Sequence, residues 1–151
     1  MKKQIQKRRG MAGSATAELS LLLPFLLLAV LGITDFSRVC FQTIAIANAA
    51  HAGAKYGSHS PAHIGDEMGI RTAVLNELSD MDFDETLLVQ VDQYCECPDG
   101  TVIDCVSGTC GLAATRTFVS VRIEKPFDAL FSYPGIPDNL TLAREAHVRA
   151  M

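Results

Sequence analysis

An apolar run from Ala12 to Ile33 constrains the fold of this chain more than any other feature. It contains a single charged residue, Glu18, and the next charge is Asp35. As a helix the run would extend about 33 Å at 1.5 Å per residue, close to the roughly 30 Å hydrocarbon core of a bilayer. We therefore predict that it spans a membrane. Pro24 removes the hydrogen bond to the Ser20 carbonyl, so we expect a kink or a locally melted turn, with a Ser or Thr hydroxyl available to the freed carbonyl.

Charge is distributed unevenly around this run. Five basic residues occupy the first nine positions, ahead of any acid: Lys2, Lys3, Lys7, Arg8 and Arg9. All 17 acidic residues follow, with the other eight of the 13 basic residues. The positive-inside rule then predicts a cytoplasmic N-terminus and an exported body after Asp35. An acidic body is not expected to bind nucleic acid.

Two other readings of the run are less favoured. A secretory signal would need a cleavage site directly after the apolar region, but the A-x-A patterns of residues 45–49 lie beyond Asp35 and Arg38. A lipoprotein anchored through Cys40 would need a better lipobox than residues 37–39 supply. The run is therefore predicted to stay attached to the body.

The start of the run resembles a class III signal. In the sequence GSATAE a glutamate stands fifth after a glycine, directly behind the basic leader. In type IV pilins and pseudopilins a prepilin peptidase cuts after such a glycine and often methylates the new N-terminus. The resemblance implies that Gly13 precedes the cut, Ser14 becomes the N-terminus and Glu18 occupies position +5. Gly10 competes as the cleavage site, but the spacing to Glu18 favours Gly13.

A role for Glu18 follows from its environment. A carboxylate within the membrane costs a few kcal/mol unless it finds a partner. The α-amino group released at Ser14 would supply one, either within one chain or between staggered neighbours in a filament. The second arrangement would set axial register, as one buried polar group does in a coiled coil. The alternative is a glutamate that snorkels to the cytoplasmic interface without a partner.

The resemblance extends over residues 8–57, which are similar to the TadE family of pseudopilins or minor pilins in the tight-adherence (Tad, Flp) pilus system. The shared features are the arginines and glycine before the small residues and glutamate, Leu-Pro in an aliphatic run, and an Ala-rich helix ending in Gly53-Ala54 and Tyr56-Gly57. The family implies a structural protein, held in the inner membrane and required for assembly of a pilus used in surface adhesion. It implies as partners a prepilin peptidase, other Tad pilins and pseudopilins, and the inner-membrane platform and secretion machinery.

The pattern after Asp35 predicts the rest of the fold. Apolar and small residues recur every three or four positions, which indicates that the helix continues as an amphipathic stalk: Phe36, Val39, Thr43, Ile46, Ala50, Gly53 and Gly57. Its alanines and glycines would allow close packing, either on neighbouring subunits or on its own domain. A second helix is expected from about Ala62 to Leu78. We predict three segments: a leader over 1–13, a transmembrane and stalk helix over 14–57, and a periplasmic α+β domain over 58–151.

The last part of the chain alternates apolar and polar residues, as strands of an antiparallel sheet do when one face is buried. The predicted inward residues are Leu87, Val89, Val91, Thr117, Val119, Val121, Ile123, Leu140, Leu142, Ala146 and Val148. Pro98-Asp99-Gly100 predicts a hairpin turn between arms at Thr86–Cys97 and Thr101–Val106. The fold class is therefore α+β and pilin-like: a long N-terminal helix packed on a small antiparallel sheet. Phe127, Leu130, Phe131 and Tyr133 are expected to cap the core rather than form a docking patch.

Four cysteines surround the predicted turn: Cys95, Cys97, Cys105 and Cys110. In an exported body they predict two disulfides, each worth about 3 kcal/mol by loop entropy. Cys95 and Cys97 share one side of a strand and are not expected to bond each other, which leaves the pairings 95–105 with 97–110, or 95–110 with 97–105. A zinc site is less favoured, because C-x-C is not the usual spacing. Cys40 remains as a free thiol or an intermolecular bridge.

Catalysis finds no support in the sequence. The histidines at 51, 59, 63 and 147 are scattered, and no H-E-x-x-H, G-x-S-x-G or phosphate-binding glycine loop is present. His59 and His63, near Asp66 and Glu67, are better explained as a polar loop than as a weak metal site. We expect no enzymatic activity and no cofactor. The alternative function is a single-pass anchored periplasmic module whose cysteine-rich hairpin captures a metal or another ligand.

Overall fold

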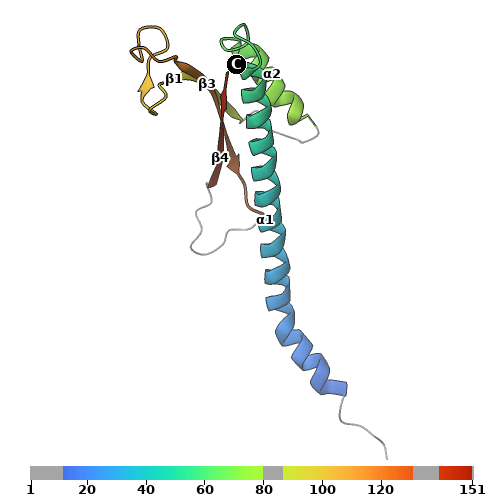
Figure 1. Cartoon of the computed structure of the whole chain (residues 1–151). Coiled ribbons are helices and arrows are strands. Elements are labelled where there is room, and N and C mark those ends of the chain that lie inside the picture. Colours follow the sequence, from blue (N-terminus) through green and yellow to red (C-terminus); the bar gives the residue numbers. More distant parts are fainter. Residues whose placement is uncertain (1–11, 80–86, 131–139, 151) are drawn as a thin grey trace, which may run out of the picture. The chain divides into compact units, whose positions relative to one another are not determined.

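The computed structural model describes residues 12–79, 87–130 and 140–150. The chain divides into two units, Met1–Ser37 and Arg38–Met151. Helix α1 (Ala12–Ser58) begins in the first unit and ends in the second (Figure 1). The remaining elements all belong to the second unit: α2 (Glu67–Glu77), β1 (Leu88–Glu96), β2 (Val102–Ile103), β3 (Arg116–Phe127) and β4 (Leu140–Arg149).

The four strands form one antiparallel sheet in the order β2-β1-β3-β4. Strand β3 is central and pairs along most of its length with both neighbours, so that Val121 lies opposite Val91 on one side and Ala146 on the other. This sheet, the long helix and the disulfide-bonded hairpin confirm the predicted fold class.

The core lies where the C-terminal half of α1 packs on the sheet and on α2. Its fully buried residues come from three elements: Ile46, Ala49, Ala50 and Ala54 of α1, Ile70 and Val74 of α2, and Val119, Val121 and Ile123 of β3. The strand residues among them belong to the face predicted from alternation. The small residues of α1 among them are therefore buried in their own domain. For these residues the structure selects packing on the domain over packing on neighbouring subunits.

Two glycines of α1 allow α2 to approach closely. A Cβ at Gly53 would lie 2.6 Å from Val74 Cγ2, and one at Gly57 would lie 2.8 Å from Ile70 Cδ1 and 3.0 Å from Val119 Cγ1. Real Cβ atoms do not approach other atoms so closely, because packed interiors leave no such overlap. Glycine at both positions is thus a packing requirement of this domain.

Helix α2 begins later than predicted, at Glu67 rather than near Ala62. Asp66 is the reason, because its side chain accepts a hydrogen bond from the Gly69 backbone N–H (2.9 Å) and caps the helix. The residues predicted as the first turn form hydrogen-bonded turns instead, with His63 N–H donating to Ser60 O and Asp66 N–H to His63 O.

The hairpin arms are also shorter than predicted. Strand β2 contains only Val102 and Ile103, paired with Glu96 and Cys95. The second arm fails at Asp104, whose carboxylate accepts backbone N–H groups of Val106 and Ser107 and turns the chain away from the sheet. Thr86, the expected start of the first arm, lies outside the described residues.

Of the apolar residues predicted to cap the core, the one that ends β3 is buried. Phe127 is buried, at 3% exposure, whereas Leu130 is exposed. The Arg38 guanidinium lies over the Phe127 ring, 5.4 Å from its centroid, and donates to the Asp128 carbonyl oxygen. Phe131 and Tyr133 lie outside the described residues.

We expect Gly53→Ala to lower the melting temperature by roughly 5–10 °C, because the added methyl group overlaps Val74 and overpacking costs about 1–3 kcal/mol. Thermal unfolding of the detergent-solubilised full-length chain, followed by circular dichroism, measures this. Gly65→Ala is the matched control, since a Cβ there meets nothing within 4 Å. Equal melting temperatures for the two variants would contradict the packing assigned to Gly53.

Candidate functional site

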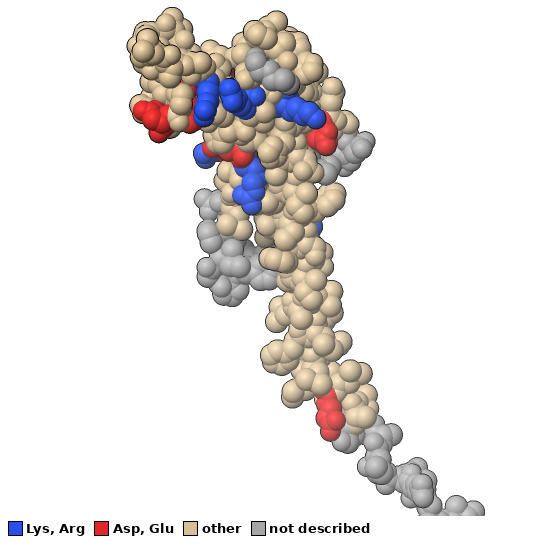
Figure 2. All heavy atoms as spheres, viewed as in Figure 1, with Lys and Arg blue, Asp and Glu red and all other residues tan. Residues whose placement is uncertain are grey.

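The N-terminal part of α1 exposes apolar side chains along its described length. Leu21, Phe25, Leu28 and Ile33 are all more than 60% exposed, and most of their apolar neighbours from Leu19 to Phe36 are at least half exposed, whereas Leu31 is half-buried. On the face that Figure 2 shows, the charged side chains gather on the second unit, and the described part of the first carries almost no charge. A surface of this kind requires lipid or apolar protein around it. Among the described residues, one helical segment, Ala15–Ser58, is long and apolar enough to span a membrane, so it is a possible anchor.

Three hydroxyl groups of this part of α1 donate hydrogen bonds within the helix. Each donates to a carbonyl three or four residues earlier: Ser20 to Ala17 (2.8 Å), Thr34 to Val30 (2.9 Å) and Ser37 to Ile33 (2.7 Å). Such bonds remove the desolvation cost that an unpaired hydroxyl has in lipid. The Ser20 hydroxyl therefore donates to the Ala17 carbonyl. The carbonyl that loses its helical donor at Pro24 is a different one, that of Ser20, about one turn later.

The predicted assembly residues all lie on α1. Gly13, Ser14, Glu18 and Pro24 are helical, and the α-helix continues through Pro24 without the locally melted turn that was one expectation. Glu18 is exposed on the helix surface. It lies about 6 Å along the axis from Ser14 at 1.5 Å per residue, roughly one turn. The leader residues 1–11 lie outside the described residues, and the roles of these four positions and a kink at Pro24 remain predictions.

Residues 13–55 match the family model of TadE-like protein. This segment is TadE-like. The match confirms the resemblance inferred from the sequence, begins at the glycine predicted to precede the cut, and covers less than a third of the 151 residues. No curated protein and no solved structure matches the chain significantly.

Beyond the TadE-like segment, two disulfides hold the tip of the hairpin. Cys95 bonds Cys105 and Cys97 bonds Cys110, closing sequence separations of 10 and 13 residues. The structure thus confirms the predicted disulfides and selects one of the two pairings left open. The zinc alternative was wrong, because all four thiols are consumed. The fifth cysteine, Cys40, is free and exposed on α1.

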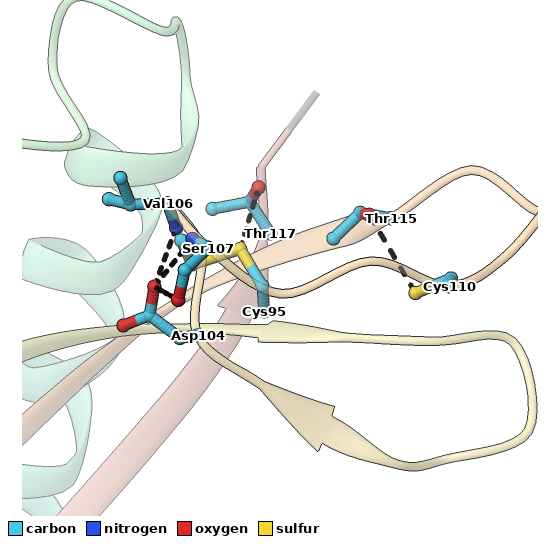
Figure 3. Close-up of a disulfide and its surroundings, with 8 residues drawn as sticks. Cys95, Asp104, Val106, Ser107, Cys110, Thr115 and Thr117 are labelled. Carbon is cyan, nitrogen blue, oxygen red and sulfur yellow. Dashed lines mark hydrogen bonds between the residues drawn. A yellow bond between two sulfur atoms is a disulfide. The ribbon is translucent and has the colours of Figure 1, made fainter.

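Hydrogen bonds from the backbone fix the loops between these bridges. The Asp104 carboxylate accepts from the N–H groups of Val106 and Ser107 and from the Ser107 hydroxyl, all within 2.9 Å (Figure 3). These donors lower the pKa of Asp104. The Thr101 N–H does the same for Asp99, and Gly100 turns the chain with a left-handed φ of 88°. Both carboxylates are therefore held ionised at neutral pH.

Sequence reasoning missed a cluster that ties the end of α1 to α2. The Tyr56 hydroxyl donates to Asp66 Oδ2 (3.1 Å), which raises the pKa of Tyr56, and the His63 ring stacks on Tyr56 with centroids 4.6 Å apart. His59 stacks in turn on His63. An aspartate directly before a Glu-initiated helix is a capping signal and could have indicated this start. In the described ranges, no three His, Cys, Asp or Glu residues form a metal-binding group.

The sheet face away from the core carries charges that pair with one another. Arg122 forms salt bridges with Glu124 and Glu145, and Ser120 donates to Glu145 (2.7 Å). Tyr94 and Phe118 stack beside them, 5.2 Å apart. The ion pairs of this face are partly exposed to solvent.

We expect the double substitution Cys97→Ser with Cys110→Ser to cost about 3 kcal/mol of unfolding free energy, because it opens a loop of 13 residues. Guanidinium unfolding of the full-length chain in detergent measures this, with Cys40→Ser as the control that removes a thiol but no bridge. Digestion after Glu96, Asp99 and Val106 places each of the four cysteines on its own fragment for peptide mapping. Fragments joining Cys95 to Cys110 would contradict the assigned pairing.

Proposed function

We propose that this chain is a minor pseudopilin required for assembly of a Tad pilus that serves surface adhesion. Before assembly it is anchored in the inner membrane by α1, with its N-terminus in the cytoplasm and its disulfide-bonded domain in the periplasm. A prepilin peptidase removes residues 1–13, and the mature chain then joins other Tad pilins, the inner-membrane platform and the secretion machinery. Its role is structural rather than enzymatic.

The observation that carries this proposal is the TadE-like match over residues 13–55, the segment that also contains the apolar helix. The family suggests a protein of the Tad pilus system. Two further features support the finer role: the basic leader sets orientation, and the disulfides agree with an oxidising compartment outside the cytoplasm. The anchored binding module would share the helix and the disulfides, but it would not need cleavage after Gly13.

Glu18 supplies the assembly step in this proposal. Cleavage creates a cationic α-amino group at Ser14, about one helical turn from the Glu18 carboxylate. Within lipid the two groups attract strongly, because neither retains its hydration shell. If the amine of one subunit pairs with Glu18 of its neighbour, the contact offsets the cost of the buried charge and fixes the stagger between helices. The exposed apolar surface around Glu18 then packs against neighbouring subunits instead of lipid.

We expect the protein isolated from its native membrane to begin at Ser14. Intact-mass measurement checks this in cells with and without the prepilin peptidase. Gly13→Leu should block cleavage, whereas Gly10→Leu should leave it unchanged and so serves as the control for the competing glycine. A chain that keeps its leader in wild-type cells would favour the anchored binding module.

We expect Glu18→Gln to reduce pilus fibres by about tenfold or more, since the loss of an ion pair in lipid exceeds about 1.4 kcal/mol. Fibres are counted by electron microscopy, and membrane levels of the cleaved protein are measured in parallel. Glu77→Gln, on the exposed surface of α2, is the matched control. Normal fibre numbers with Glu18→Gln would remove the assembly role of the carboxylate.

A further inference from the structure

The tip of the hairpin exposes apolar side chains that the fold does not use. Val102 is 64% and Val106 95% exposed, and Leu112 is fully exposed. Val102 is on β2 and Val106 is in the loop that the Cys97–Cys110 bridge closes, while Leu112 follows Cys110 by two residues. Large aliphatic side chains held in water on a rigid loop are unfavourable for the isolated domain, and such exposure is typical of a binding surface.

The same tip is acidic. Residues 95–115, from the first disulfide cysteine to the residue before β3, contain three acidic residues and no basic one: Glu96, Asp99 and Asp104. An anionic membrane surface would repel a segment of this composition. A partner with basic side chains next to apolar ones would be attracted to it.

A groove of about 360 Å³ opens at this tip beside the second disulfide. Pro98, Ile103 and Ala113 line it together with the Cys97–Cys110 bridge, and Asp99 is the one carboxylate among its lining residues. Thr101 and Thr109 complete the lining. Its apolar side chains and single carboxylate fit a long aliphatic stem that ends in a cation, which describes the side chains of arginine and lysine.

The groove is also preorganised. The Cys97–Cys110 bridge fixes one wall, and the turn over Asp99 is closed by hydrogen bonds from Gly100 N–H to Cys97 O and from Cys97 N–H to Thr101 O, both 2.9 Å. A site that is already ordered loses little conformational entropy when a ligand binds.

We propose that this groove binds an arginine or lysine side chain from a partner protein, and that apolar residues beside that cation cover Val102, Val106 and Leu112. Asp99 pairs with the cation, while Pro98, Ile103 and Ala113 contact its aliphatic stem. The proposal is independent of the pairing of Glu18 with the N-terminus, so either can fail without the other.

The test uses the full-length chain in a neutral detergent, with ¹³C-labelled isoleucine and alanine methyl groups. The probe is the capped peptide Leu-Arg-Leu, and the matched probe is Leu-citrulline-Leu, which has nearly the same shape without the charge. We expect the arginine peptide to shift the methyl signals of Ile103 and Ala113 in a saturable way, and the citrulline peptide to bind about three- to fivefold more weakly.

Asp99→Asn should weaken binding of the arginine peptide by the same three- to fivefold, because asparagine keeps the turn but loses the charge. Asp104→Asn is the matched control, since it makes the same change at a turn outside the groove and should leave the affinity unchanged. Equal binding of both peptides, or equal effects of both substitutions, would overturn the proposal. The same methyl shifts produced by vesicles of phosphatidylcholine and phosphatidylglycerol would assign the surface to lipid and overturn it as well.

Discussion

Burial of one face of α1 holds the second unit together. The stripe containing Ile46, Ala50 and Ala54 packs on β3 and α2, and Gly53 and Gly57 bring α2 close enough for Val74 and Ile70 to fill the remaining space. The hydrophobic effect acts here through small residues, which allow backbones to approach and bury surface over a short distance. This contact also positions the sheet that carries the tip.

The sequence alone predicts the elements whose signal is periodic. Three patterns carry that signal: the apolar run, the helical spacing from Val39 to Gly57, and the alternation around Val119, Val121 and Ile123. The last two reflect burial of one face of an element, and the order of apolar and polar residues shows this directly. The limits of α2 and β2 were wrong because single side chains set them. Asp66 caps a helix and Asp104 ends a strand through hydrogen bonds whose geometry no periodicity contains.

The candidate site divides in the same way. The proposed assembly contact at Glu18 is found from the sequence, because Glu18 is the single charge in an apolar run. The choice between the two disulfide pairings did not follow, because both satisfy the spacing of the four cysteines. The structure resolves it through the register of β1 with β2, which places Ile103 opposite Cys95 and brings Cys105 within a Cα separation of 5.1 Å. Three-dimensional register therefore carries information that loop length lacks.

The tip is joined to the sheet by two residue pairs and two covalent bonds, and it contributes little to the core beyond Cys95 and Cys97. Its loops are therefore held by the disulfides and by the hydrogen bonds to Asp99 and Asp104 rather than by burial. Exposed residues of such a segment can be substituted without disturbing the core, provided that the four cysteines and the turn at Gly100 are kept. Substitutions at the exposed positions of the tip should therefore leave the packing of the core unchanged.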